Sequence, residues 1–280
     1  MKKAITVLFI SIVTLNSCTD VVRVNVPEAA PRLVVEASLD WEKGTNGSTQ
    51  FITLTESAPF FGITSNSPVT TATVKVTNTS ANQEFIFSHQ GNGIYRTDSF
   101  LPILNDSYTL EISYDGETYR AEETLIPLAD IDEVNESRTG GFDVEALEAN
   151  IYFNDPVDEE NFYLFRFEEL GDILPQLLAI PDEFTNGNRM KVFFEKIDDE
   201  DTDEEAFVSG DVANMSFYGI SKQYYNYMDL LIDQYENSQN PFGTVPASIK
   251  GNCVNITVPE HYAFGYFRVT QVEKVTYTFQ

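Results

Sequence analysis

Short apolar runs separated by turn signals recur along most of this chain. In residues 32–40, for example, Leu33, Val35, Ala37 and Leu39 occupy every second position. Alternation with a period of two places these side chains on one face of a strand. The runs are rich in Val, Ile, Thr, Tyr and Phe, which pack well in sheets, and aromatic residues make up 13% of the sequence. The sequence therefore predicts a mainly β protein.

The first half of the chain has the spacing of a β-sandwich. It contains about seven short strand-like runs with turn signals at regular intervals, the pattern of an immunoglobulin-like sandwich. Its clearest local signal is Asp115-Gly116 in the middle of residues 108–124. Asp-Gly accepts the positive φ angles of a two-residue hairpin turn, so the flanking strands should pair antiparallel. We predict an immunoglobulin-like β-sandwich over residues 32–127.

The second half starts after an acidic stretch that contains glycine. We interpret residues 128–141 as an interdomain linker and residues 142–280 as a second β-rich domain. Two C-terminal strands are expected, over residues 264–270 and 272–279. The stretch that runs through Pro175 and Pro181 is expected to be a loop.

One amphipathic helix is predicted within this second domain, over residues 221–237. Ser221 can serve as its N-cap. Tyr224, Met228, Leu231 and Tyr235 then recur at three- and four-residue spacing, which places them on one helix face, and Tyr225 and Ile232 widen this stripe.

Charge and cysteine content narrow the possible partners. The formal net charge is -27, and such a polyanion repels nucleic acid and anionic membrane surfaces. The two cysteines, Cys18 and Cys253, cannot make a cysteine-rich zinc site. If the Cys18 thiol is covalently modified by a lipid, as its surrounding sequence described below implies, Cys253 has no partner for an intramolecular disulfide. Stability then has to come from a hydrophobic core.

The N-terminus has the pattern of a secretory signal. Lys2 and Lys3 precede a mostly apolar run over residues 4–15. That run has roughly a dozen residues, whereas a membrane-spanning helix needs on the order of 20. Export followed by cleavage is therefore predicted in place of a permanent membrane span.

The end of this signal, Leu15-Asn16-Ser17-Cys18, resembles the lipobox of bacterial lipoproteins. The resemblance implies that residues 1–17 are removed, that Cys18 carries the lipid, and that residues 18–31 form a tether. Acyl chains contribute about 0.8 kcal/mol per buried methylene, so lipid can anchor the chain without a basic patch. The alternative is a plain secreted chain that is cut elsewhere.

Four aromatic residues are candidate contacts for a ligand or partner: Trp41, Tyr224, Tyr225 and Tyr227. Tyrosine and tryptophan offer an apolar face together with a hydrogen-bonding group, which suits sugars and protein surfaces. Packing in the core is the commoner use of such side chains.

Two acidic stretches are weak candidates for calcium, a cation that takes six to eight oxygen ligands. The first contains Asp155, Asp158, Glu159 and Glu160, and the second is the run 198–205. Neither has the spacing of an EF-hand loop. The alternatives are a strand connection for the first and a solvated loop for the second, and the sequence predicts no resident metal or cofactor.

Enzyme motifs are missing from the sequence. It has no Gly-x-Ser-x-Gly elbow, no His-Glu-x-x-His, no phosphate-binding glycine loop and no Rossmann fingerprint. Cys253 lies on a predicted strand, where a buried and inert thiol is the simpler interpretation. We therefore predict a protein that is not an enzyme.

Several segments in a fixed order resemble one family across nearly the whole mature chain. They follow the lipobox cysteine and are residues 31–36 (PRLVVE), 115–119 (DGETY), 155–156 (DP), 161–163 (NFY), 240–242 (NPF), 249–252 (IKGN) and 264–267 (FGYF). The chain is similar to Bacteroidetes outer-membrane lipoproteins classed only as a domain of unknown function. Their genes often lie beside those of TonB-dependent transporters.

This resemblance implies a lipid-anchored outer-membrane accessory protein, a partner of a TonB-dependent transporter in nutrient capture. It supplies no catalytic residues, and it leaves the side of the membrane open. Two other functions stay open. An envelope hydrolase acting on glycan or peptide would show a deep cleft with converging carboxylates. A structural or adhesive sandwich would show a flat surface without a pocket.

Overall fold

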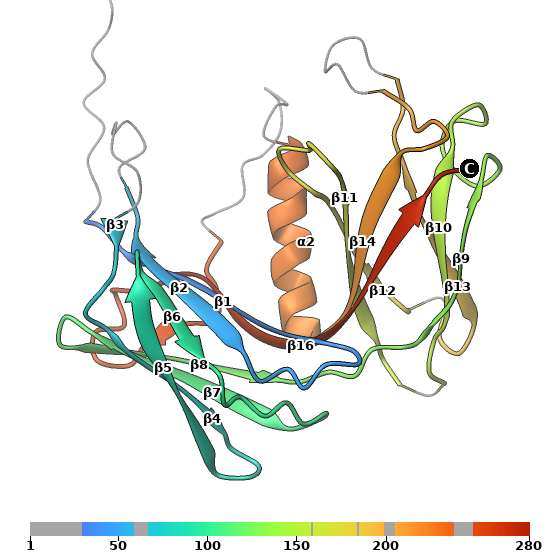
Figure 1. Cartoon of the computed structure of the whole chain (residues 1–280). Coiled ribbons are helices and arrows are strands. Elements are labelled where there is room, and N and C mark those ends of the chain that lie inside the picture. Colours follow the sequence, from blue (N-terminus) through green and yellow to red (C-terminus); the bar gives the residue numbers. More distant parts are fainter. Residues whose placement is uncertain (1–29, 59–66, 158, 184, 199–204, 238–248) are drawn as a thin grey trace, which may run out of the picture. The chain divides into compact units, whose positions relative to one another are not determined.

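The protein, seen here in a computed structural model, is built almost entirely from strands (Figure 1). The structure describes residues 30–280 except 59–66, 158, 184, 199–204 and 238–248. The predicted signal peptide, Cys18 and most of the predicted tether therefore lie outside the described residues. The mainly β class predicted from the sequence is confirmed, and α2 (Lys222–Asn237) is the one helix of the described residues.

The strands follow in chain order. They are β1 (Leu33–Glu42), β2 (Gln50–Glu56), β3 (Ser67–Pro68), β4 (Thr73–Asn78), β5 (Gln83–Gly91), β6 (Ile94–Thr97), β7 (Ser107–Tyr114), β8 (Glu117–Thr124), β9 (Ile131–Ser137), β10 (Glu148–Asn154), β11 (Phe162–Glu169), β12 (Gln176–Pro181), β13 (Arg189–Glu195), β14 (Val212–Ile220), β15 (Val254–Asn255) and β16 (Phe264–Thr278).

The N-terminal strands form the predicted sandwich. Strand order runs β16-β1-β2-β6-β5-β4-β7-β8-β15, and β5 pairs with β6 near one end and with β4 near the other. Two layers therefore face each other and bury one core. The inward residues of β1 belong to it, as the alternation predicted: Leu33, Val35, Ala37 and Leu39.

The hairpin predicted at Asp115-Gly116 is confirmed. Both residues have positive φ, 50° for Asp115 and 78° for Gly116, as a two-residue turn between twisted strands requires. Strands β7 and β8 pair antiparallel on either side of it, from Tyr114 opposite Glu117 to Ser107 opposite Thr124.

The C-terminal strand β16 belongs to both halves of the chain. Its first part pairs parallel with β1, from Phe264 opposite Val34 to Val272 opposite Glu42, and its last part pairs antiparallel with β14. Residues 264–270 and 272–279 were predicted as two strands, but they form this one strand. The N-terminal sandwich over residues 32–127 is therefore completed by residues from the far end of the sequence.

The second core lies between two sheets. One is the β12-β11-β14-β16 end of the large sheet and the other is β13-β10-β9. Alternate residues of β10, β11 and β14, such as Ile151, Phe165 and Phe217, meet in this core. Residues 128–141 were predicted as a linker, but residues 131–137 form β9, because they pair with one edge of β10 while β13 pairs with the other.

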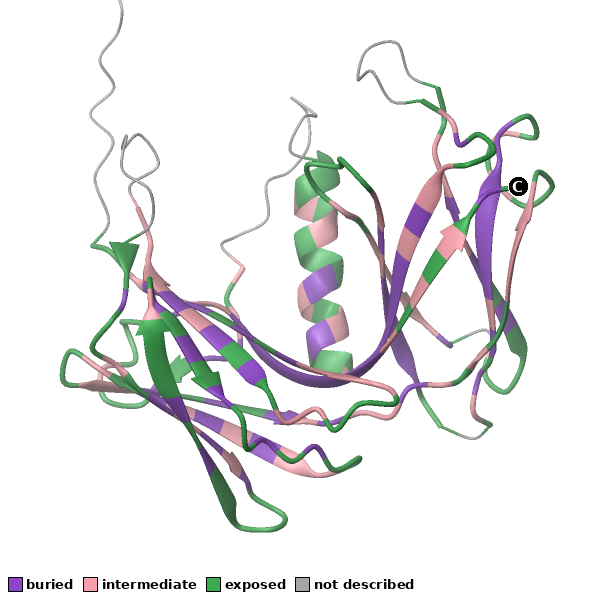
Figure 2. Ribbon diagram, viewed as in Figure 1, coloured by how far each residue is buried: buried purple, intermediate pink, exposed green. Residues whose placement is uncertain are grey.

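Helix α2 covers the opposite face of the β11-β14-β16 strands (Figure 1). Ser221 caps the helix as predicted, since its hydroxyl accepts a hydrogen bond from the Tyr224 N–H at 3.1 Å. Tyr224 and Met228 are buried, and Figure 2 shows the buried positions confined to part of the helix. Tyr225 and Ile232 of the predicted stripe are half-buried, whereas Leu231 and Tyr235 are exposed at 39% and 65%.

Candidate functional site

The tyrosines at the start of α2 pack against β16. The ring centroids of Tyr224 and Tyr227 each lie 4.8 Å from that of Tyr266. Tyr225 instead lies on Phe162, at 5.0 Å. Tyr224 is buried, and Tyr225 and Tyr227 are half-buried. The structure therefore places these three candidate contact residues mainly in a packed aromatic cluster.

Trp41, the fourth candidate, lies elsewhere. It packs against the N-terminal core, whereas the α2 tyrosines belong to the core under the helix. Its indole N–H donates to the Thr45 carbonyl at 2.9 Å, which fixes the ring over the β1–β2 connection. The structure therefore does not bring Trp41 together with the tyrosines.

An ion pair between a buried arginine and a half-buried aspartate lies beneath this aromatic cluster, and the sequence analysis missed it. The Arg268 guanidinium donates to Asp40 at 3.0 Å and to the Tyr224 hydroxyl at 3.1 Å. It also lies 4.7 Å from the centroid of the Tyr218 ring. Burial alone would lower the pKa of Arg268, but the Asp40 carboxylate outweighs it and the net pKa is raised. A lone arginine among the apolar residues of the β16 segment is the signal that could have revealed the pair.

Glu123 joins β8 to the start of the helix. Its carboxylate accepts hydrogen bonds from the Ser221 hydroxyl at 3.0 Å and the Tyr266 hydroxyl at 3.4 Å. Burial raises the pKa of Glu123. A perturbed, buried carboxyl is a possible catalytic group, but these hydrogen bonds give it a positioning role for the helix N-terminus.

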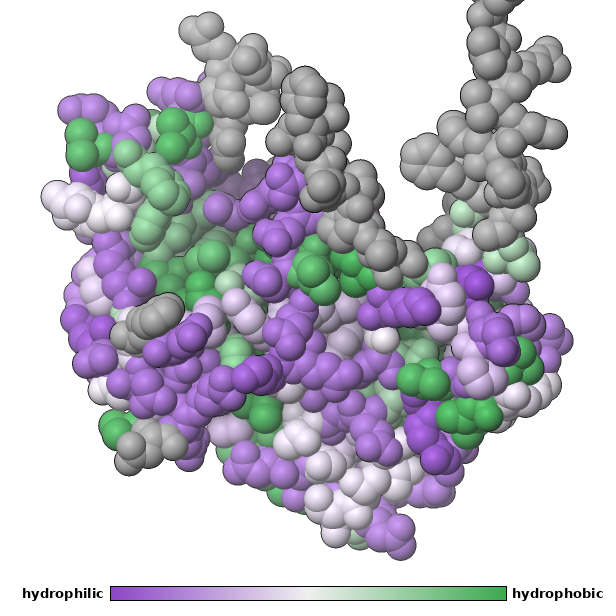
Figure 3. All heavy atoms as spheres, turned by 180° about the vertical axis from the view of Figure 1, so that it is seen from behind, coloured by the Kyte–Doolittle hydropathy of each residue, from purple (hydrophilic) through white to green (hydrophobic). Residues whose placement is uncertain are grey.

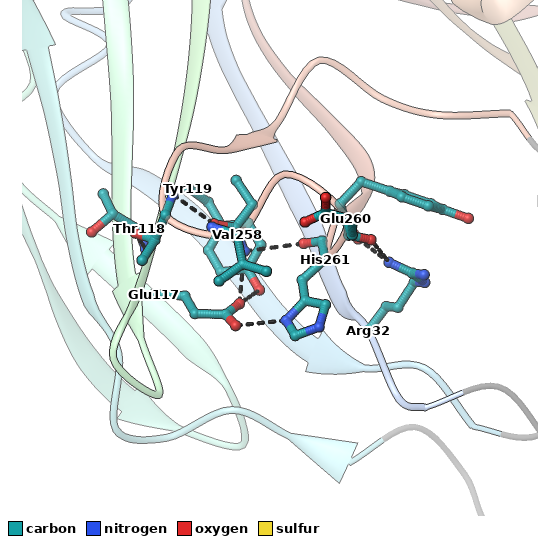
Figure 4. Close-up of polar contacts among 10 residues, drawn as sticks. Arg32, Glu117, Thr118, Tyr119, Val258, Glu260 and His261 are labelled. Atoms are coloured by element: carbon teal, nitrogen blue, oxygen red, sulfur yellow. Dashed lines mark hydrogen bonds and ion pairs between the residues drawn. The ribbon is translucent and has the colours of Figure 1, made fainter.

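The carboxylate of Glu117 binds the 250–263 loop to the β7–β8 hairpin (Figure 4). Oε1 of Glu117 lies 2.6 Å from Nδ1 of His261, and Oε2 accepts from the Asn255 amide at 2.7 Å. The Tyr119 hydroxyl donates to the same carboxylate at 2.8 Å. Asn255 is fully buried and also accepts from the backbone N–H of Val258, so it shapes the loop from within.

The same loop contacts Arg32, the residue that precedes β1. Arg32 donates to the Glu260 carbonyl at 2.9 Å, and its guanidinium lies 3.8 Å from the centroid of the Tyr262 ring (Figure 4). The ammonium of Lys250 lies 4.2 Å from the same centroid. Cation–π contacts of this kind add to the attachment of the loop.

The pH dependence of stability should report this attachment. The hydrogen bond to His261 is the main cause that holds the pKa of Glu117 below its ordinary value of 4.5. A depressed carboxyl pKa stabilises the fold above the unfolded-state value, and the gain is lost as the pH falls through the lower folded value. We expect Glu117→Gln to lower the melting temperature at neutral pH, and the difference from wild type to shrink below about pH 4.5.

Thermal unfolding followed by circular dichroism across this pH range checks the expectation. Glu122→Gln is the matched control, because Glu122 lies exposed on the same strand. If the melting temperature of Glu117→Gln differed from that of the wild type by the same amount from neutral to acidic pH, the ionised Glu117 carboxylate would not be what stabilises the loop.

The calcium candidates near residue 155 do not converge. Asp155 is buried and accepts hydrogen bonds from the Tyr163 hydroxyl at 2.5 Å and the Gly187 N–H at 2.9 Å. Glu160 pairs instead with Lys222 at 2.7 Å, and Glu159 is exposed. Asp158 lies outside the described residues, as do residues 199–204 of the second acidic run. Within the described ranges no three His, Cys, Asp or Glu side chains gather where they could hold a metal ion.

An apolar groove lies where α2 and β12 run side by side. Its volume is about 350 Å³. The β12 side contributes residues 174–177, and the helix side contributes Leu231, Ile232, Tyr235 and Glu236. Outside the groove, the turn between β11 and β12 also carries strongly exposed apolar side chains, Leu170 at 93% and Ile173 at 96%. Exposed apolar surface of this kind on a soluble domain marks an interaction site.

One acidic side chain, Glu236, lines this groove. Asp229, Glu183 and Asp233 are close enough to Tyr225, nearer the start of α2, to act on its hydroxyl. Burial is the main reason that the pKa of Tyr225 is raised, and these three carboxylates raise it further. Figure 3 shows a largely hydrophilic surface on the face seen from behind, with hydrophobic side chains gathered in a few places. The groove thus combines apolar walls with a single carboxylate, that of Glu236.

Among the helices in the described ranges, none is long and apolar enough to cross a membrane.

Comparisons with known proteins give a family and distant structural likenesses. No curated protein matches the sequence. Similar solved structures include a DUF4785 family protein from Legionella pneumophila, with 14% identity, a TM-score of 0.26, and coverage of 67% of this chain and 51% of that one. A two-domain fibronectin type III segment of chicken tenascin has 9% identity and a TM-score of 0.22, and the match covers 70% of this chain and 89% of the tenascin segment. The chicken interferon gamma receptor alpha chain has 11% identity and a TM-score of 0.20, and the match covers 69% of this chain and 89% of the receptor chain.

A family model matches residues 19–276, nearly the whole chain. The chain therefore belongs to the family described as Domain of unknown function (DUF4249).

Proposed function

We propose that this protein is a lipid-anchored binding component of the outer membrane that works with a TonB-dependent transporter in nutrient capture. The observation that carries the binding role is the groove between α2 and β12, with its exposed apolar walls. An apolar groove of about 350 Å³ offers a partner a place to bury side chains. The lipobox-like segment ending at Cys18 supports the anchor, and the resemblance to outer-membrane lipoproteins supports the location and the transporter.

The arrangement of ionisable groups supports binding over catalysis. Glu117, Glu123, Asp155 and Arg268 each have a buried or half-buried partner that they position. A catalytic site needs such groups to converge on a space that a substrate can enter. The groove is lined instead mostly by aliphatic and aromatic side chains.

Membrane attachment is the first expected result. Cys18→Ser should move the protein from the membrane fraction to the soluble fraction, because the serine cannot take the thioether-linked lipid. Cys253→Ala is the matched control and should stay in the membrane fraction, since Cys253 is buried and its burial raises the pKa of the thiol to about 12. Fractionation, immunoblotting and mass spectrometry of the first mature residue provide the measurements. A bare Cys18 in the natural product would overturn the anchor.

The transporter is tested separately by affinity purification of the tagged, membrane-attached protein after crosslinking. A TonB-dependent transporter should be recovered with the wild type and with Cys253→Ala. Recovery of the protein without any transporter would contradict the proposed partnership.

A further inference from the structure

Two buried aspartates at one end of the second core have no cationic partner. Asp155 and Asp182 are only 5% and 2% exposed. Neither takes part in any ion pair within the described part of the chain. A buried carboxylate without a compensating charge is costly, and two of them close together also repel each other. The described residues therefore leave two negative charges uncompensated in this place.

Hydrogen bonds from consecutive residues hold these two carboxylates near each other. Oδ2 of Asp155 accepts from the Gly187 N–H at 2.9 Å. Oδ2 of Asp182 accepts from the side-chain amide of Asn186 at 3.2 Å. The Tyr163 hydroxyl donates to Oδ1 of Asp155 at 2.5 Å. Burial is the main cause that raises the pKa of Tyr163, and the carboxylates of Asp155 and Asp182 both raise it further, so both lie near its hydroxyl.

The side chain of Asn161 brings an unsatisfied oxygen to the same place. Asn161 is 9% exposed, and its Oδ1 has no hydrogen-bond partner. Its carbonyl accepts from the Asp182 N–H at 3.1 Å, which continues the β11–β12 pairing by one residue. Directly paired residues point to one face of a sheet, and a residue two positions along a strand points the same way. Because Tyr163 belongs to the second core, Asn161 and Asp182 face the end of that core as well.

Asp155 reaches this place from the opposite sheet. It lies two residues after Phe153 of β10, whose side chain belongs to the second core. The ring centroids of Phe153 and Tyr163 are 4.9 Å apart, so the two sheets meet here. Oxygens from both sheets therefore converge, two carboxylates and the amide oxygen of Asn161. Of the residues predicted to bind calcium, this set keeps Asp155 alone.

We propose that Asp155, Asp182 and Asn161 bind a calcium ion that joins the β10–β11 connection to the β12–β13 connection. Each carboxylate oxygen of Asp155 accepts one hydrogen bond and keeps a second lone pair, and Oδ1 of Asp182 accepts none from the described residues. Calcium takes six to eight oxygens from carboxylates, amides and water in a flexible geometry. Water completes the set that the three side chains begin.

The charge and the ligand types favour calcium among the common hard cations. Two uncompensated carboxylates balance a divalent ion. Magnesium requires near-ideal octahedral geometry and keeps several water molecules, which suits a buried set of protein oxygens less well. The inference goes beyond the proposed function and does not depend on it, since other residues line the groove.

Calorimetry and thermal unfolding of the purified protein test the proposal. After treatment with EDTA and dialysis into physiological sodium chloride, titration with calcium chloride should give a saturable heat. The melting temperature by circular dichroism should rise by at least about 5 °C when calcium exceeds its dissociation constant about a hundredfold, because an ion that binds only the folded state stabilises it. Magnesium chloride at the same concentration should raise the melting temperature far less.

Two variants at neighbouring positions locate the ion. Asp182→Asn should weaken calcium binding by at least about tenfold, because the affinity of such sites depends on the number of charged ligands. In EDTA it should be at least as stable as the wild type, since one of two like charges is gone and the asparagine oxygen can still accept from Asn186. Glu183→Gln is the matched control, because Glu183 is exposed and its replacement removes the same charge. It should respond to calcium as the wild type does.

Several results would overturn the proposal. The first is a wild type that shows neither a saturable heat nor a rise in melting temperature with calcium. An equal calcium response of the wild type and Asp182→Asn would place the ion elsewhere. An equal loss of response in Asp182→Asn and Glu183→Gln would show an effect of net charge alone, and an equal response to magnesium would contradict the choice of calcium. If Asp182→Asn were less stable than the wild type in EDTA, the Asp182 carboxylate would need no ion to balance it.

Discussion

Replacing Asp40 by alanine is expected to lower the free energy of unfolding by about 3 kcal/mol, since it leaves the buried Arg268 guanidinium without its carboxylate partner. Only 10% of the Arg268 side chain is exposed, and Asp40 is its one carboxylate partner among the described residues. The Tyr224 hydroxyl and the face of Tyr218 would be left as its neighbours. Urea unfolding followed by tryptophan fluorescence or circular dichroism measures the change. The loss is a large share of the roughly 5–15 kcal/mol that holds a typical domain folded.

Two controls separate burial from charge. Asp98→Ala breaks the exposed ion pair in which Nη2 of Arg96 lies 2.6 Å from Oδ1 of Asp98. It should lower the free energy of unfolding far less, because solvent screens surface ion pairs. The double variant Asp40→Leu with Arg268→Met removes both charges and should recover much of the stability lost in Asp40→Ala. Equal losses for Asp40→Ala and Asp98→Ala would contradict the importance of burial.

Gly265→Ala is expected to destabilise the protein by about 3 kcal/mol or more, since it combines backbone strain with a clash. Gly265 has a φ of 83°, and a Cβ added there would lie 2.0 Å from the carbonyl oxygen of Val35. Val35 is its register partner in the parallel β1–β16 pairing. The two strands would have to separate at the point where the C-terminal strand joins the N-terminal sandwich.

Gly44→Ala isolates the backbone contribution. Gly44 has nearly the same φ, 81°, but no atom lies within 4 Å of an added Cβ. Gly44→Ala should lower the free energy of unfolding only by the strain of the left-handed backbone conformation, roughly 1–2 kcal/mol. Urea unfolding of both variants gives the difference. A loss for Gly44→Ala as large as that for Gly265→Ala would show that the contact with Val35 is unimportant.

Local patterns in the sequence predicted the elements that local rules govern. The alternation in β1, the Asp115-Gly116 hairpin and the Ser221-capped helix all appear where they were expected, because each depends on residues close together in the chain. Strand β12 was missed because Pro175 and Pro181 suggested a loop. An edge strand tolerates proline where the N–H would face solvent, and only the sheet order shows that β12 is an edge.

The candidate site depended on contacts that no local pattern contains. The apolar stripe of α2 was predicted as a whole, but no residue after Met228 is fully buried, since β12 ends the sheet beside the second half of the helix. Leu231 and Tyr235 therefore line a groove instead of a core. In the same way, Arg268 and Asp40 are far apart in the sequence and meet only through the β1–β16 pairing.

By itself the sequence determined the mainly β class, the acidic body and the position of the helix, because composition and short-range periodicity fix these. The tertiary structure alone decided that β16 serves both cores and that β12 ends the sheet beside an open groove. Strand order and parallel pairing join residues across the full length of the chain, and their energies depend on neighbours that periodicity does not specify.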